Sequence, residues 1–494
     1  MIDTAALREK VLDLAIRGKL VPQDPNDEPA SVLLERIRAQ KLQMVKEGKL
    51  KAKDIKDDTI IFKGDDNCHY EKFADGTVKN IQEEIPFDLP DGWSWCRISA
   101  LGTTNIGLTY KPTDICKDGT MVLRSSNIKN GKIDLTDLVK VNTIIRDNQY
   151  METNDILICA RNGSKSLVGK CAIYKELKEK AAFGAFMTVL KTPCYKFAFY
   201  FLNTRFFRAI LDSDDSKQIN QLTQDLLKNA LIPLPPFAEQ NRITSHLDNA
   251  YSLIEEINEH SSELETLKNL LKSKILELAI QGKLVEQDEN DEPASVLLER
   301  IRAEKKAQLG KKYVESYIYK GDDNCYYQKI ENQELVFVKK LDIPKGWAAC
   351  SISDISSLIN TANIQLKTKD ILSVGIFPVV SQGQDLIDGY CDECKYAIKD
   401  IPVVLFGDHT RNVKYIDFAF VVGADGTKIH KIHIVNPKYV YYWMLYAAKK
   451  ISDKGYARHY ALLRKECFYL PPLSEQTKIV KKIEYLFNIL KDEG

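Results

Sequence analysis

The chain repeats part of itself, and this duplication limits the possible architectures more than any other feature. Residues 15–41, AIRGKLVPQDPNDEPASVLLERIRAQK, return at 279–305 with 23 of 27 positions identical. Three shorter elements return in the same order. They are FKGDDNCHYEK and YKGDDNCYYQK, LPDGW and IPKGW, and LPPFAEQ and LPPLSEQ. The intervening segments, 96–232 and 348–469, share almost nothing that can be aligned, so a repeated frame holds two different inserts.

The frame reads as helical. After the first LPPFAEQ, apolar residues recur in steps of four and three, which is a heptad seam. The seam consists of Ile243, Leu247, Ala250, Ile254, Ile257, Leu264, Leu271, Ile275 and Leu278. We expect one helix over 238–281, ended by Gly282. Segments 4–17 and 474–492 carry the same spacing and would pack on it as its split partner.

These patterns predict an α+β protein with two globular α/β domains. Long antiparallel coiled-coil helices with pseudo-two-fold symmetry would separate the domains. The expected parts are an N-terminal helix with the first repeated extension (1–90), a first module (91–235), the central helix with the second extension (236–342), a second module (343–471) and a C-terminal helix (472–494). Within the modules, 155–159 and 402–406 read as buried strands, and 197–212 and 439–450 as helices with core aromatic residues.

Charge is spread unevenly along the chain. The net charge is only +1 over 494 residues. Segment 96–236 nevertheless holds 20 Lys and Arg against 13 Asp and Glu, and segment 348–472 holds 15 against 12. The remaining chain is therefore acidic. Two basic inserts on an acidic frame are typical of two modules that face nucleic acid.

The sequence carries few signs of export, membranes or metals. The N-terminus does not read as a signal peptide, and the longest apolar run, near 439–448, is about half of what a bilayer span needs. We therefore expect a cytoplasmic protein with no membrane partner. The eleven cysteines are then expected to be free thiols. Cys391 and Cys394 have metal-ligand spacing, but a second pair is missing, so we expect no metal site.

A search for catalytic motifs returns one near match. Leu234, Pro235, Pro236 and Phe237 approach the Asn/Asp-Pro-Pro-aromatic element of adenine methyltransferases. Leucine cannot accept a hydrogen bond from an exocyclic amine, and no Gly-rich cofactor loop accompanies the element. The sequence also lacks the P-loop pattern of nucleotide-binding enzymes. We expect no catalytic and no cofactor-binding residue in this chain.

A Pro-Pro element followed by Ala/Ser-Glu-Gln and a long helix closes each variable segment. With this arrangement the chain resembles the specificity subunits of type I restriction–modification systems over essentially its whole length. Shorter fragments resemble the target recognition domains of that family, in the same order in both segments. They are LRSSNI (123–128) and FPVVSQGQ (377–384), LICARNGS (157–164) and LFGDHTRN (405–412), and SKQINQLT (216–223) and YARHYALL (456–463).

The resemblance implies a non-catalytic subunit that reads a split target in double-stranded DNA. Each recognition domain would read one half-site, and the helical frame would hold the two domains apart. Two modification (methyltransferase) subunits would dock on the frame, and restriction (helicase–nuclease) subunits would join them. S-adenosylmethionine, ATP and Mg²⁺ are expected on those partners and not on this chain. The stretch from Lys19 to about Lys72 exceeds the minimal family pattern and is a candidate docking surface.

Arg reads guanine, Asn and Gln read adenine, and Lys and Arg hold phosphates, so polar loop residues are the candidate DNA contacts. In the first module they are Arg124, Ser125, Asn127, Arg161, Asn162, Lys165, Gln218 and Asn220. In the second they are Gln382, Gln384, His409, Arg411, Asn412, Lys428, Arg458 and His459. Two other classes of function stay open at this point: a fused or accessory nuclease–methyltransferase component, and a coiled-coil scaffold whose modules bind peptide or RNA.

Overall fold

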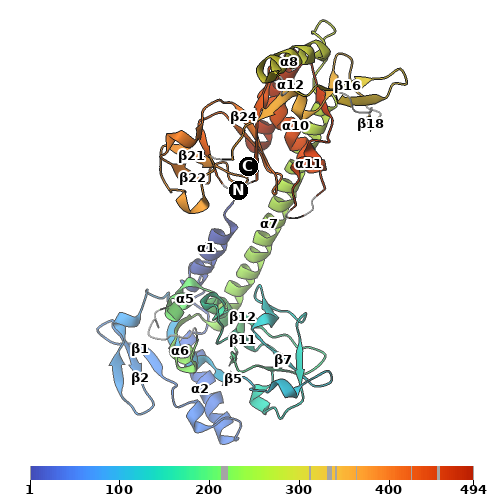
Figure 1. Ribbon diagram of the computed structural model, residues 1–494. Helices are drawn as coiled ribbons and strands as arrows, with labels where there is room; N and C mark the ends of the chain where they lie inside the picture. Colours follow the sequence, from blue (N-terminus) through green and yellow to red (C-terminus); the bar gives the residue numbers. More distant parts are fainter. Residues whose placement is uncertain are drawn as a thin grey trace. The chain divides into compact units, whose positions relative to one another are not determined.

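The computed structural model describes residues 2–212, 221–310, 313–330, 336–339, 342–362, 364–423, 426–452, 455 and 457–492. The chain divides into two compact units, 1–261 and 262–494. Each unit combines helices with small β-sheets, which confirms the α+β class (Figure 1). Helix α7 (Phe237–Ile280) belongs to both units, with 237–261 in the first and 262–280 in the second.

The first unit opens with its copy of the frame, blue in Figure 1. Two helices are followed by a short 3-10 turn and a three-stranded antiparallel sheet in the order β1-β2-β3. These elements are α1 (Thr4–Ile16), α2 (Ala30–Lys46), η1 (Ala52–Asp54), β1 (Ile60–Lys63), β2 (His69–Lys72) and β3 (Val78–Asn80).

The first module holds two four-stranded sheets, ordered β12-β11-β14-β5 and β13-β7-β10-β6, and the pair β15-β4 closes it. Its strands are β4 (Ser94–Arg97), β5 (Thr103–Ile106), β6 (Ile115–Cys116), β7 (Thr120–Leu123), β8 (Ile128–Lys129), β9 (Lys132–Ile133), β10 (Val139–Val141), β11 (Ile156–Cys159), β12 (Cys171–Ile173), β13 (Ala181–Phe183), β14 (Met187–Lys191) and β15 (Leu231–Leu234). Its helices are α3 (Ile98–Leu101), α4 (Tyr195–Leu202), α5 (Arg205–Asp212) and α6 (Gln224–Asn229).

The second unit repeats the frame with α8 (Ala294–Leu309) and the sheet β16 (Ser316–Lys320), β17 (Tyr326–Ile330) and β18 (Val336–Lys339). The strands of its module are β19 (Ala348–Cys350), β20 (Ser356–Leu358), β21 (Phe377–Val380), β22 (Gly389–Cys391), β23 (Ala397–Ile398), β24 (Val403–Gly407), β25 (Val413–Ile416), β26 (Phe420–Val422), β27 (Thr427–Ile432) and β28 (Phe468–Leu470). Its helices are α9 (Ile352–Ile355), α10 (Pro437–Lys450) and α11 (Tyr460–Leu463), and α12 (Leu473–Asp492) follows.

The two modules share a topology that their sequences do not reveal. The sheet β20-β27-β24-β25 repeats β5-β14-β11-β12, with every neighbouring pair antiparallel. In the second sheet of each module, β7 pairs in parallel with β13, and β21 pairs in parallel with β26. The predicted strands at 155–159 and 402–406 are β11 and β24, the fully buried centre of each module.

Each module is locked to the helix that follows it by residues of the repeated motifs. The Trp93 indole N–H donates to Glu239 Oε2 at 3.0 Å, and the Trp347 indole donates to Glu475 Oε2 at 2.8 Å. Both glutamates are nearly fully buried. Burial raises the pKa of both carboxyls, while the indole bonds oppose that rise. The Trp of the DGW/KGW element and the Glu of the AEQ/SEQ element are therefore two halves of one contact.

The glutamine of that motif and the glycine before each extension complete the lock. Gln240 and Gln476 each donate to the first proline carbonyl of the preceding Pro-Pro pair at 2.9 Å. Gly18 and Gly282 have φ of +65° and +67°, and a Cβ on either would collide with a proline ring, that of Pro90 or Pro344. Glycine is required there both for the left-handed conformation and for the close approach.

Helix α1 packs antiparallel to the first part of α7. The Thr4 hydroxyl donates to Asn258, the Arg8 guanidinium lies over the Tyr251 ring, and Leu12 shares a core with Leu247. In the second unit, the end of α7 shares a core with α12 through residues such as Ala279 and Ile479.

The middle of the predicted seam is not buried. Leu264 and Leu271 are 49% and 51% exposed, and the neighbouring Leu267 and Leu270 are exposed as well. The described residues therefore leave the middle of the predicted seam uncovered around Leu264 and Leu271. The reason is that α1 begins at Thr4, opposite Asn258, so its pairing with α7 ends before Leu264 is reached.

The aromatic residues predicted as core are core. Phe197, Phe201, Tyr439 and Trp443 are at most 1% exposed. The helix predicted over 197–212 is broken at Asn203 and Thr204, where the Thr204 hydroxyl bonds the Phe201 carbonyl and ends α4. Among the described helices, none combines the length and the apolar character that crossing a membrane requires.

Candidate nucleic-acid interface

Three chain segments meet at one end of the central sheet in both modules. In the first module, one segment follows β7, another follows β11, and the third precedes α6. In the second module, the corresponding segments follow β21, follow β24 and precede α11. The third segment is fixed to the second by a backbone hydrogen bond: Leu222 N–H to the Ala160 carbonyl at 2.7 Å, and His459 N–H to the Asp408 carbonyl at 2.8 Å. The described parts of the fragments that resemble recognition domains therefore assemble into one surface in each module.

In the first module this surface is hollowed into a cavity of about 960 Å³. Arg124 and Ser125 line it from the turn after β7, and Arg161 and Asn162 line it from the turn after β11. The Asn162 amide donates to Ser125 Oγ at 2.9 Å and ties the two turns together. Four of the eight predicted contacts of this module thus lie in one concave site, whose wall is otherwise largely apolar.

The two arginines that line the cavity differ in how they are held by neighbouring side chains. The Arg124 guanidinium is paired with Asp137 at 2.9 Å, so DNA would have to compete with that carboxylate. Arg161 is exposed, and its guanidinium carbon lies 5.5 Å from the centre of the Phe186 ring. A cation over an aromatic face stays available to an anionic or hydrogen-bonding partner at its edge.

Two predicted residues of this module, Asn127 and Lys165, do not line the cavity. Asn127 is 0% exposed, and its amide group donates to the Asp134 and Asp137 carbonyls and accepts from the Arg124 N–H. It folds the 125–137 loop, and we withdraw it as a base-reading candidate. Lys165 is exposed, and its ammonium nitrogen lies 3.3 Å from Asp212 Oδ1. The predicted contacts Gln218 and Asn220 lie outside the described residues.

The second module builds the same connection between turns with different side chains. The Asn412 amide donates to the Gln382 carbonyl at 3.0 Å, as Asn162 does to Ser125. Gln382 Oε1 accepts from the His409 N–H at 3.1 Å. Gln382, His409 and Asn412 are brought together, and each keeps part of its surface exposed.

Arg411 has a structural role in the same turn. Its φ is +61°, and its guanidinium donates to the Ile451 carbonyl at 3.0 Å, which fastens the turn after β24 to the end of α10. It is therefore more constrained than Arg161, although both follow the central strand.

The other four predicted residues of the second module differ in how exposed their side chains are. Gln384 and Arg458 are exposed. The Lys428 ammonium lies 5.9 Å from the Tyr460 ring centre. His459 is 0% exposed, and its ring nitrogen Nδ1 lies 3.1 Å from the Asp408 carbonyl oxygen. The buried ring therefore stabilises the turn that follows β24. We withdraw His459 as a direct contact for that reason.

Sequence reasoning missed two residues of this surface. Phe186, between β13 and β14, is 61% exposed on the cavity wall. Thr410 donates its hydroxyl to the Gln382 carbonyl at 2.6 Å. The search for polar residues passed over Phe186, although its place in a Gly184-Ala185-Phe186 turn between two short apolar strands was a readable signal.

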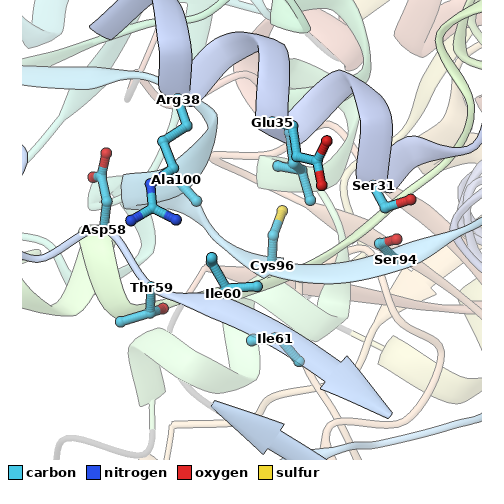
Figure 2. A pocket seen from close by; sticks show the side chains of 11 residues that line it. Ser31, Glu35, Arg38, Asp58, Thr59, Ile60, Ile61, Ser94, Cys96 and Ala100 are labelled. Atoms are coloured by element: carbon cyan, nitrogen blue, oxygen red, sulfur yellow. The ribbon is translucent and has the colours of Figure 1, made fainter. Parts of the chain in front are cut away.

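The frame of the first unit holds a smaller cavity of about 110 Å³ (Figure 2). It lies between α2, β1 and β4, and Figure 2 shows Arg38 reaching from α2 toward Asp58. Asp58 Oδ2 is bound by Lys41 at 2.5 Å, whereas its buried Oδ1 has no hydrogen-bond partner among the described atoms. This cavity is remote in the chain from the turns of the module.

Other chemistry is scarce in the described part of the chain. It contains no group of three or more His, Cys, Asp or Glu side chains that could hold a metal ion. Burial raises the pKa of the Cys159 thiol beneath the first cavity and raises that of Cys171 to about 12. Thiols held protonated in this way are poor nucleophiles.

Comparison with known proteins shows which family has this architecture. The family model described as "Type I restriction modification DNA specificity domain" matches residues 90–266 and 344–493. The specificity subunits of the type I restriction enzymes EcoAI and EcoEI from Escherichia coli are 30% and 29% identical over 75% and 71% of this chain. The matches span 65% and 61% of those two proteins. A chain from a study of type I R-M complex assembly and conformational transition shares the fold, with a TM-score of 0.51, 16% identity, and coverage of 82% of this chain and 93% of that one.

Proposed function

The chain belongs to the family of type I restriction–modification DNA specificity domains, and we propose from this that it reads a split DNA target, one half-site with each module. One observation carries the proposal. The modules have the same sheet topology and bring the same three segments together, yet the side chains at that surface differ. A common scaffold with different polar readers is what two different half-sites require.

The reading side chains are then Arg124, Ser125, Arg161 and Asn162 in the first module and Gln382, His409 and Asn412 in the second. Arg161 suits a guanine edge, and Gln382 and Asn412 suit adenine edges. Lys165, Gln384, Lys428 and Arg458 are the positions for phosphate or further base contacts, with Gln218 and Asn220 completing the predicted set. Arg411 orders its turn and contributes charge to the surface.

The proposed role includes two modification subunits docked on the frame, joined by restriction subunits. Support comes from exposed positions that the repeat keeps identical on α2 and α8. These are Ser31, Val32, Glu35, Arg36 and Ala39, which return as Ser295, Val296, Glu299, Arg300 and Ala303. Packing does not require identity at exposed sites, whereas two equal docking surfaces for one kind of partner do. The exposed leucines of α7 add an apolar surface of the kind that partners cover.

This chain would carry out no reaction itself. S-adenosylmethionine, ATP and Mg²⁺ would be bound by the modification and restriction subunits, and the chain would act in the cytoplasm, where the DNA lies.

The test is co-expression with modification subunits, followed by sequencing that detects methylated adenines. We expect methylation of one bipartite motif. Replacing 348–469 with the corresponding module of another specificity subunit should change one half of that motif and leave the other half intact. A change in both halves, or methylation by the purified chain alone, would refute the proposal.

A further inference from the structure

The cavity of the first module holds one side chain that hydrogen bonding does not explain. Phe186 is 61% exposed among the polar candidates Ser125, Arg161 and Asn162. Its exposure is built in by the backbone. The Phe186 carbonyl accepts both the Ala160 N–H at 2.9 Å and the Arg161 N–H at 3.0 Å.

The neighbouring residue places Phe186 at the end of a tight turn. Met187 begins β14, is 1% exposed, and donates its N–H to the Gly184 carbonyl at 2.8 Å across a tight turn. Phe186 is therefore the last residue of a tight turn, directly before a strand whose first side chain is buried. The two hydrogen bonds that its carbonyl accepts fix the Phe186 backbone in this turn, from which its ring lines the cavity.

The second module lacks such a group at the corresponding turn before β27. Gly426 lies there with φ of +90°, and a Cβ on it would lie within 3 Å of the Gln382 and His409 side chains. In the second module the Gln382 and His409 side chains therefore lie against the residue directly before β27, whereas in the first module the residue directly before β14 is Phe186. At this place the first module presents an apolar aromatic ring, whereas the second module presents polar side chains.

We propose that Phe186 is a specificity-determining residue that packs against the C5-methyl group of a thymine in the half-site of the first module. That methyl is the apolar group which the four bases present in the major groove, so it is the feature an exposed ring among polar readers can recognise. Arg161, held over the ring, would read the neighbouring base pair through its exposed edge. The inference rests on the proposed function.

The test uses the assembled complex with modification subunits and DNA in which each thymine of the target is replaced, one at a time, by uracil. Wild-type complex should lose about fourfold in affinity at one thymine of the first half-site, the factor expected for one methyl-sized apolar group. Phe186→Ala should bind thymine and uracil DNA equally at that position. Phe186→Leu should keep part of the discrimination.

Ile144→Ala is the matched control, because Ile144 is 92% exposed in the same unit but does not line the cavity. It should keep the full uracil penalty. The proposal is overturned if Phe186→Ala retains that penalty, or if no thymine of the first half-site is sensitive in wild type. Failure of the proposed function looks different: the wild-type complex would then show no preferred motif at all.

Discussion

The two copies of the frame are nearly identical along their helices but are fastened to their modules by different chemistry. In the first unit, Arg97 forms a two-pronged ion pair with Glu71 and also bonds Glu84 at 2.7 Å. In the second unit, Gln328 stands at the position of Glu71, and its amide donates to the Ser316 hydroxyl of the same sheet at 3.2 Å. A buried ion pair thus anchors the first sheet to its module, whereas the matching residue of the second sheet makes a neutral bond within the sheet.

The buried lysine of the repeat shows the same contrast. Lys41 and Lys305 both donate to carbonyls at the end of a short helix, α3 or α9, as at Gly102 (3.1 Å) and Ser356 (3.0 Å). Unbonded carbonyls at a helix C-terminus favour a cation. Lys41 also has the carboxylate of Asp58, and Lys305 is held by backbone carbonyls.

The cavity of Figure 2 lies beside another position at which the two frames differ. In the first frame Ile60 lines it opposite Arg38. In the second frame Tyr317 takes the place of Ile60, and the Arg302 guanidinium lies 5.3 Å from its ring centre. The lesson is that the helical half of the frame contacts what the modules share, whereas the sheet has adapted to each module.

The largest expected effect is on the charged anchor. Arg97→Ala leaves Glu71 buried without its partner, which costs about 3–5 kcal/mol when a buried pair is broken. We expect hydrogen exchange to accelerate in 60–80 and to change little in 316–330. Equal acceleration in both segments would show that the effect of losing Arg97 is not confined to the first sheet.

A second difference between the units is the loss of stability that we expect for the second unit at low pH. Burial lowers the pKa of His430 to about 3, and the imidazole Nε2 has no hydrogen-bond partner among the described atoms. Unfolded histidine takes up a proton below about pH 6.5, and the folded ring does not. Stability is therefore full above pH 6.5 and falls between pH 6.5 and 3, by about 2 kcal/mol at pH 5.

His430→Leu should flatten that loss in the second unit, measured by denaturant unfolding at pH 7 and pH 5. The first unit, followed by exchange of its own peptides, serves as the internal control. A mutant with the wild-type acid slope would remove His430 as its source.

A third prediction compares the module surfaces. Arg161→Ala should weaken binding of the assembled complex about 5–150-fold, as losing one good base contact does. Arg411→Ala should also loosen its turn, because Arg411 bonds the Ile451 carbonyl. Affinity titrations combined with thermal unfolding separate the cases: only Arg411→Ala should lower Tm. Unchanged affinity of Arg161→Ala at several salt concentrations would exclude it from the interface.

The smallest effect is expected at Gln328, whose neutral hydrogen bond lies within the second sheet. Gln328→Ala removes this one bond and should cost about 0.5–1.5 kcal/mol. The measurement is the same exchange experiment, now read in 316–330. A cost as large as that of Arg97→Ala would contradict the proposed difference between the two positions.

From the amino-acid sequence alone we could infer the duplicated frame, the long helix, the α+β class, both central strands and the family. These depend on local periodicity and on exact repetition, which are properties of neighbouring residues. It also identified the turns that meet at the candidate surface, because polar residues after short buried strands mark loops.

Which side chains of those turns remain at the surface depends on how distant parts of the chain pack together. Asn127 and His459 look like readers in sequence, yet both are enclosed because backbone groups distant in sequence use their hydrogen-bonding atoms. Leu264 looks like core, yet it is exposed because α1 begins too late to cover it. Burial depends on what another part of the chain places opposite a residue, and no local pattern encodes that.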